Sequence, residues 1–252
     1  MTKRHCLVFL LGFFVFFALW WFAARIVDNR LILPTPSAVF DVLVSAPGYY
    51  FTISLRTFGF ATGGLVISAL FALAVGFAAT GWRFFEFVYP IMVAVKATPA
   101  VVFAPILAAI IGSGPIVKIT VAALIALFPI VVSTIEGARL TPNDLRILGV
   151  AYGASKWRMI WKIDSIYLIN GWLIGIQSAA PLAVIGAIVA EFVDPSDVNR
   201  GGIGLDIAIK KNSSAIPHLY AGAICAVLIG VLSFWIAFSI ARSFQRKYEL
   251  GK

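Results

Sequence analysis

Long runs without charged residues alternate with short polar connections along the whole chain. A helix that crosses the roughly 30 Å hydrocarbon layer of a bilayer needs about 20 apolar residues. Runs of this order predict six membrane-spanning helices, at about residues 7–27, 57–81, 87–111, 116–135, 166–190 and 219–241. The pattern therefore predicts an all-α integral membrane protein with a single transmembrane domain over residues 1–252.

The first apolar run has a second interpretation as a cleaved signal peptide, because Lys3 and Arg4 precede it. The apolar cores of signal peptides are shorter, about 7–15 residues, and end at a cleavage site of small residues. The run from Leu7 to Ala24 is longer, is rich in Phe and Trp, and is followed by no convincing site of that kind. We therefore expect an uncleaved first span.

Composition and charge support the membrane interpretation. The chain is 61% hydrophobic and 12% charged, whereas an ordinary soluble domain is about 25% charged. The net charge of +9 comes from basic residues in the short connections, which argues against nucleic-acid binding. With the N-terminus inside, twelve Lys and Arg residues fall in inner segments and seven in outer ones. This bias predicts that both termini and the connection 136–165 are cytoplasmic.

Residues typical of metal or catalytic chemistry are isolated in the sequence. Cys6, Cys225, His5 and His218 have neither metal-ligand spacing nor the pattern of a disulfide framework. There is also no phosphate-binding loop and no recognisable pair of nucleophile and base. We therefore expect no cofactor, no metal and no catalytic residue, so that any ATP hydrolysis takes place on a separate subunit.

Two connections are longer than the others. The outer one, residues 28–56, contains ILPTPSAV (32–39) followed by an amphipathic stretch. The inner one, residues 136–165, contains AYGASKWRMIWKI (151–163), in which Trp and Ile alternate with Lys and Arg. Taken alone, this inner segment could be a helix lying in the membrane interface, with Trp at the level of the headgroups.

Four motifs give the chain a resemblance to a known family. The segment 32–39 resembles a Leu-Pro-x-Pro motif, and 95–119 resembles a region with a basic residue, prolines and a Gly-x-Gly/Ser-x-x-x-Lys element. Segments 189–192 (VAEF) and 201–207 (GGIGLDI) resemble Ala-Glu and Gly-Ile-Gly landmarks. In this order they resemble the inner-membrane permeases of binding-protein-dependent ABC importers, in the branch for nitrate, sulfonates, taurine and thiamine precursors.

That family carries a cytoplasmic loop with the pattern Glu-Ala-Ala, three residues, Gly, nine residues, Ile-x-Leu-Pro. The Gly falls on Gly153 and the Ile on Ile163, with the spacing intact, whereas the Glu and Leu-Pro positions hold other residues. This departure is compatible with a specialised ATPase partner or with a heterodimer whose other permease has the intact motif. The resemblance implies an ATPase-coupling loop that consists of Gly149, Tyr152, Gly153, Ala154, Ser155, Lys156, Arg158 and Ile163. In such a loop, two short helices meet at the glycine, which tolerates the sharp turn.

The resemblance also implies an assembly. We expect a type I importer permease-like fold in the bacterial inner membrane, paired with a second permease copy or a paralogue. Cytoplasmic ATP-binding subunits and an extracytoplasmic substrate-binding protein would complete the system, which forms a pathway for a small solute. The alternative is a secondary transporter driven by an ion gradient, which should show internal repeats with broken helices; the two halves show no such similarity. The sequence does not identify the solute.

Three residues are candidates for the translocation pathway: Lys96, Pro99 and Glu191. Lys96 lies about 13 Å from the inner end of its predicted span at 1.5 Å per residue, and an ionisable group at such depth suggests a functional site. It could instead extend its ammonium toward the interface, or contact carbonyls that Pro99 frees. Glu191 lies near the outer boundary, where exposure to water costs little. The pair Gly171 and Gly175 is expected to permit close helix packing.

Overall fold

The computed structural model of the chain describes residues 3–27, 29, 32–80, 100–194, 201–212 and 215–248, and these residues form helices with no strand among them. The first part contains α1 (Lys3–Val27), α2 (Pro36–Ser45), α3 (Pro47–Thr80), α5 (Ala100–Ile111) and α6 (Pro115–Arg139). The second contains α7 (Asn143–Ala151), α8 (Lys156–Met159), the π-helical turn η1 (Ile160–Asp164), α9 (Ser165–Val193), α10 (Ile203–Asn212) and α11 (Ile216–Lys247). The all-α prediction is confirmed.

Four described helical segments are long and apolar enough to cross a membrane: Pro47–Ala79, Pro115–Arg139, Lys156–Val193 and Ile216–Lys247. They correspond to the second, fourth, fifth and sixth predicted spans, and each is longer than its apolar run. The first predicted span coincides with α1. Of the third, residues 100–111 form α5, and its earlier part lies outside the described residues.

The outer connection, residues 28–56, contains more helix than its polarity suggested. Its proline-rich segment starts α2, where the side chain of Thr35 accepts the N–H of Ala38 at 3.4 Å. Pro47 then begins α3 ten residues before the predicted span. Proline suits the first turn of a helix because its fixed φ is helical and no N–H is needed there. The apolar run thus marked the membrane-embedded part of α3 and missed its N-terminal extension.

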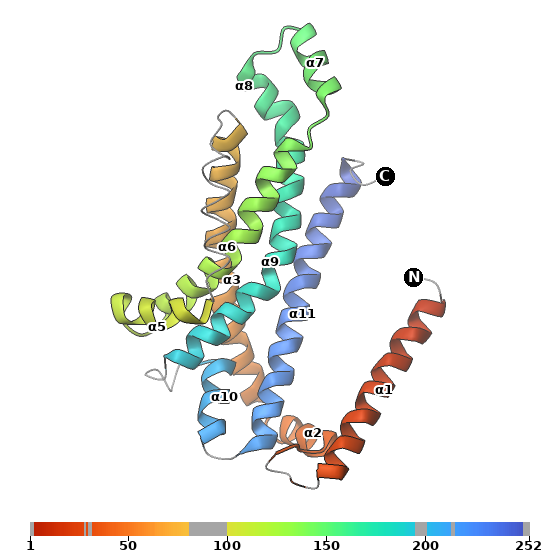
Figure 1. Cartoon of the computed structure of the whole chain (residues 1–252), viewed down its shortest axis with the longest axis vertical. Helices are drawn as coiled ribbons and strands as arrows, with labels where there is room; N and C mark the ends of the chain where they lie inside the picture. The colour runs from red at the N-terminus through yellow and green to blue at the C-terminus, as the bar shows by residue number, and fades with distance from the viewer. Residues whose placement is uncertain are drawn as a thin grey trace.

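Helices α6 and α9 run side by side and form the centre of the bundle, with α3 and α11 against them (Figure 1). Glycine makes their close approach possible. A Cβ on Gly137 would lie 2.6 Å from the carbonyl oxygen of Tyr167, and one on Gly175 would lie 2.8 Å from the Cα of Ile130. A Cβ on Gly171 would lie 2.7 Å from the Cα of Gly137. The predicted packing role of Gly171 and Gly175 is confirmed.

The two ends of the bundle differ in shape (Figure 1). At one end, α7 and α8 project beyond the other helices, and at the opposite end lie α2 and α10. Helix α1 leans away from the bundle, and at its lower end Trp20 stacks on Tyr220 of α11 with ring centroids 6.1 Å apart. Candidate functional residues lie at both ends.

Candidate functional site

The glycine predicted to join two short helices does so. Gly153 has a φ of +73°, a left-handed conformation that favours glycine. Its N–H donates to the carbonyl oxygen of Val150, and the N–H of Ala154 donates to that of Gly149, both at 2.9 Å. These two bonds form a Schellman motif, which satisfies carbonyl groups at the end of α7. Helix α7 therefore ends sharply and the chain reverses at Gly153.

The chain returns through α8 and continues into the membrane-spanning helix. The side chain of Ser155 caps α8 by accepting the N–H of Arg158 at 3.3 Å. Gly149 faces this returning segment, since a Cβ on it would clash with the sulfur of Met159 and lie 3.1 Å from Cδ1 of Ile163. The structure therefore brings the predicted loop residues together in one hairpin, residues 140–163, which we call the α7–α8 projection.

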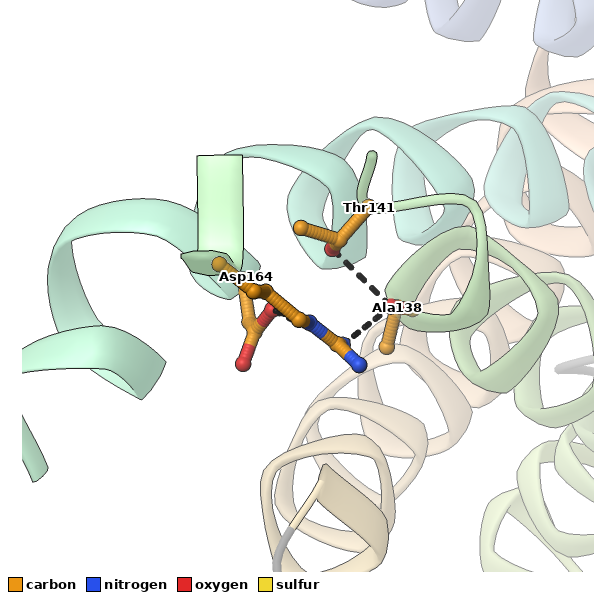
Figure 2. A network of polar contacts seen from close by, with 4 residues as sticks. Ala138, Thr141 and Asp164 are labelled. Atoms are coloured by element: carbon orange, nitrogen blue, oxygen red, sulfur yellow. Dashed lines mark hydrogen bonds and ion pairs between the residues drawn. The ribbon is translucent and has the colours of Figure 1, made fainter. Parts of the chain in front are cut away.

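An ion pair ties the projection to the bundle. The guanidinium of Arg146 donates to the carboxylate of Asp164 at 2.9 and 3.1 Å and to the carbonyl oxygen of Ala138 at 3.4 Å. Figure 2 shows Ala138, Thr141 and Asp164 at this junction, where the hydroxyl of Thr141 also donates to Ala138 at 3.0 Å. This pair was not predicted from the sequence. The signal in the sequence was Asp164 itself, a carboxylate at the start of an apolar run. A carboxylate that is buried there needs a hydrogen-bonding or charged partner.

The projection exposes large apolar side chains. No residue of α7 is buried. Tyr152 is 87% exposed, Trp157 69%, Val150 68% and Ile147 66%. Lys156 and Arg158 are exposed beside them. A surface of this composition, held rigidly away from the bundle, is typical of a site that contacts another molecule.

The opposite end of α9 has a buried polar cluster. Glu191 is 0% exposed, and its carboxylate accepts the N–H of Gly204 at 2.8 Å and the hydroxyl of Thr57 at 3.0 and 3.1 Å. The hydroxyl oxygen of Thr57 in turn accepts the N–H of Ile203 at 2.8 Å. We call Thr57, Glu191, Ile203 and Gly204 the α10 anchor. The sequence analysis expected Glu191 where water is accessible, whereas the structure buries it between α3, α9 and α10.

Other buried charged residues also lie at this end of the bundle, among them Lys118 and Asp194. Lys118, one of the seven basic residues predicted to lie in outer segments, is 0% exposed. Its Nζ has no hydrogen-bond partner among the described residues and lies 5.3 Å from the centroid of the Phe60 ring. Asp194, at the end of α9, accepts the N–H of Gly114 at 2.8 Å. Lys118 belongs to the motif at residues 95–119, but the burial of its side chain is evident only from the packing of the helices.

The other two pathway candidates, Lys96 and Pro99, lie outside the described residues. Their assignment to the pathway stays a prediction. Of the three candidates, Glu191 is therefore the one whose position the described residues include.

Comparisons with known proteins agree with the architecture. Residues 64–249 match the family described as binding-protein-dependent transport system inner membrane component. The formylaminopyrimidine transport permease protein ThiX of Halalkalibacterium halodurans is 27% identical over 89% of both chains. The riboflavin transport system permease protein RibX of Chloroflexus aurantiacus is 28% identical over 62% of this chain and 57% of its own. Carnitine transport permease protein OpuCD of Listeria monocytogenes is 28% identical over 72% of this chain and 82% of its own.

A solved structure has a similar fold. A chain of the MetNI methionine ABC transporter, in inward-facing conformations, matches with a TM-score of 0.61 over 79% of this chain and 98% of that chain. At 14% sequence identity the likeness shows the fold alone. It confirms the predicted type I importer permease-like fold.

Proposed function

Because the chain belongs to the family of inner membrane components of binding-protein-dependent transport systems, it is a permease subunit of an ABC importer, and we propose that the α7–α8 projection is its contact with the ATPase. The family match favours this function over a secondary transporter driven by an ion gradient. Systems of this kind depend on a substrate-binding protein and an ATP-hydrolysing partner. We infer that the permease pairs with a second permease and that ATP is hydrolysed on separate cytoplasmic subunits.

The observation that carries the proposal is the exposure of the projection. A helix whose apolar residues are all uncovered gains stability by burying them against a partner, at about 25 cal/mol per Å². The Gly153 turn makes the projection a compact knob, and the Arg146–Asp164 pair holds it to the start of α9. A partner that pushes on this knob would move the attached helix with it, in the manner of rigid-body coupling.

The test is a charge placed on the turn. At Gly153 no atom lies within 4 Å of an added Cβ, although the φ of +73° is unfavourable for a residue with a side chain. Gly153→Glu therefore alters the tip of the projection without crowding the bundle. We expect this variant to insert in the membrane and to lose its ATPase subunits during co-purification. Tyr248→Glu, at the exposed end of α11, is the control and should retain them. If the projection only lies in the membrane interface, both variants keep their ATPase.

We propose Lys96 as a residue of the translocation pathway, on the basis of its predicted depth in the membrane. Lys96→Met should insert normally and reduce uptake, whereas Lys96→Arg should retain part of it. Full uptake by Lys96→Met would contradict the proposal. Measurement of uptake and expression for both variants in the same cells separates transport from folding.

We propose a small organic solute as the cargo, since the names of three relatives specify formylaminopyrimidine, riboflavin and carnitine. The chain covers 89% of the first of these relatives, the formylaminopyrimidine transport permease. Mass spectrometry of what the partner binding protein retains on purification identifies the solute directly. Retention of an inorganic anion would contradict the proposal.

A further inference from the structure

Helix α10 is capped by side chains from two other helices. Its first backbone N–H groups, on Ile203 and Gly204, donate to Thr57 of α3 and Glu191 of α9, each at 2.8 Å. The first N–H groups of a helix have no partner within the helix, and they carry its positive dipole end. A distant carboxylate and hydroxyl supply the acceptors that a local N-cap residue normally provides. The start of α10 is thereby fixed to α9 and α3.

The backbone of α10 packs closely against the side chains at this junction. A Cβ on Gly202 would overlap Thr57 Oγ1 and Glu191 Oε1, and one on Gly204 would lie 2.8 Å from Cβ of Glu191. Lys118 is buried close enough to interact electrostatically with the Glu191 carboxylate. A buried carboxylate is stable only when donors and opposite charge surround it, and this one has both. The α10 anchor is therefore a rigid joint.

The same helix that carries Glu191 begins at the projection. The chain is helical from Lys156, in α8, through η1 to Val193 at the end of α9, a span of 38 residues. At 1.5 Å per residue this helix is about 57 Å long. Pro181 lies within it and removes one backbone donor. About half of the most apolar part of this helix is buried inside the bundle, so neighbouring helices support it.

We propose that Thr57 and Glu191 are positioning residues that make α10 move as one body with α9, so that displacement of the projection reaches the opposite face of the membrane through α10. This inference rests on the proposed function, because it takes the ATPase as the source of the displacement. The last turn of α10 carries Lys210 and Lys211, and Ile209 beside them is exposed. The moving helix therefore presents exposed side chains at its C-terminal end. The anchor transmits movement and need not contact the solute.

The test follows α10 in the assembled complex of permease and ATPase. A nitroxide is attached at Ile209→Cys, after serine replaces Cys6 and Cys225, and its mobility is recorded before and after trapping with ATP and vanadate. In the parent, trapping should change the spectrum. In Thr57→Val, which keeps the shape and removes the hydroxyl, the label should become more mobile and its response to trapping should fall about five- to thirty-fold, the effect of losing the two buried hydrogen bonds to Glu191 and Ile203. Thr57→Ser should restore the response.

Matched controls separate transmission from folding. Phe192→Ala changes an exposed neighbour of Glu191 and should leave the response unchanged. Basal ATP hydrolysis and co-purification should be unchanged in Thr57→Val, because the projection is intact. An unchanged response in Thr57→Val, or an equal loss in Thr57→Val and Thr57→Ser, overturns the inference. Failure of the proposed function shows separately, as ATPase subunits that stay bound to Gly153→Glu.

Discussion

The 38-residue helix Lys156–Val193 differs at its two ends. Near one end Glu191 is 0% exposed and both of its carboxylate oxygens accept hydrogen bonds, whereas Tyr152, just beyond the other end, is 87% exposed. The two regions also use glycine differently. Gly202 is required because the Thr57 hydroxyl and the Glu191 carboxylate occupy the space of a side chain. Gly153 has open space around it and is required because its φ is +73°. Packing therefore requires glycine at position 202, and backbone conformation requires it at position 153.

This contrast separates what the chain stabilises by itself from what needs a partner. The α10 anchor satisfies its polar groups within the chain, so changes there should lower the stability of the isolated permease. The α7–α8 projection leaves its apolar residues uncovered, so changes there should alter association with little effect on stability. Four substitutions test this division, from the largest expected effect to the smallest.

Glu191→Ala should destabilise the purified permease by about 2–5 kcal/mol, because the N–H of Gly204 and the hydroxyl of Thr57 lose their buried acceptor. Thermal unfolding in detergent measures the effect. Addition of Lys118→Met should recover part of the loss, since it removes a buried positive charge that the Glu191 carboxylate offsets in the parent. Glu136→Ala, an exposed acidic residue of α6, serves as control. A parent-like unfolding temperature for Glu191→Ala would show that the anchor is not needed for stability.

Gly202→Ala should cost about 1–3 kcal/mol, because the added Cβ overlaps two polar side chains that cannot move apart without breaking their bonds. Gly59→Ala, in α3, has nothing within 4 Å of the new Cβ and should raise stability by up to about 1 kcal/mol through helix propensity. The two variants are compared in the same unfolding assay. Equal stabilities would contradict the close fit around the carboxylate.

Arg146→Ala should loosen the projection and leave the bundle intact. Asp164 loses its ion pair, but the Arg146 side chain is 43% exposed, so solvent screening limits the loss to about 1 kcal/mol. Hydrogen exchange in residues 143–151 should accelerate while that of α9 beyond residue 170 stays the same. Arg158→Ala, on the exposed part of the projection, should leave both unchanged. Global unfolding on loss of Arg146 would instead mean that the ion pair supports the whole fold.

Tyr152→Ala should change stability by less than about 0.5 kcal/mol, as expected for an exposed position away from any contact. Its effect should appear in ATPase binding, with an affinity about ten-fold lower if Tyr152 is buried at the centre of the contact. Titration of detergent-solubilised permease with purified ATPase measures it. Tyr248→Ala, at the end of α11, provides the matched tyrosine control. Unchanged affinity in Tyr152→Ala would move the contact elsewhere on the projection.

Several features followed from the sequence alone because their causes are local. Uninterrupted apolar runs predicted the helices α3, α6, α9 and α11, since the bilayer requires helices of a minimum apolar length. The resemblance to the family's loop implied a turn at Gly153, and the residue type fits, because glycine readily adopts a φ of +73°. The four motifs at residues 32–39, 95–119, 189–192 and 201–207 gave the resemblance to the permease family, which the match over residues 64–249 confirms.

Only the tertiary structure decided which polar residues meet. Thr57 and Glu191 are 134 residues apart in the chain, and hydropathy alone gives no sign that they are hydrogen-bonded. Lys118 and Glu191 lie near the ends of apolar runs, where the sequence predicts contact with water, yet α10 and the neighbouring helices enclose them. Burial depends on which helix faces pack together, and that is a property of the assembled bundle. The apolar runs determined which segments enter the membrane, and helix packing determined where their few charges lie.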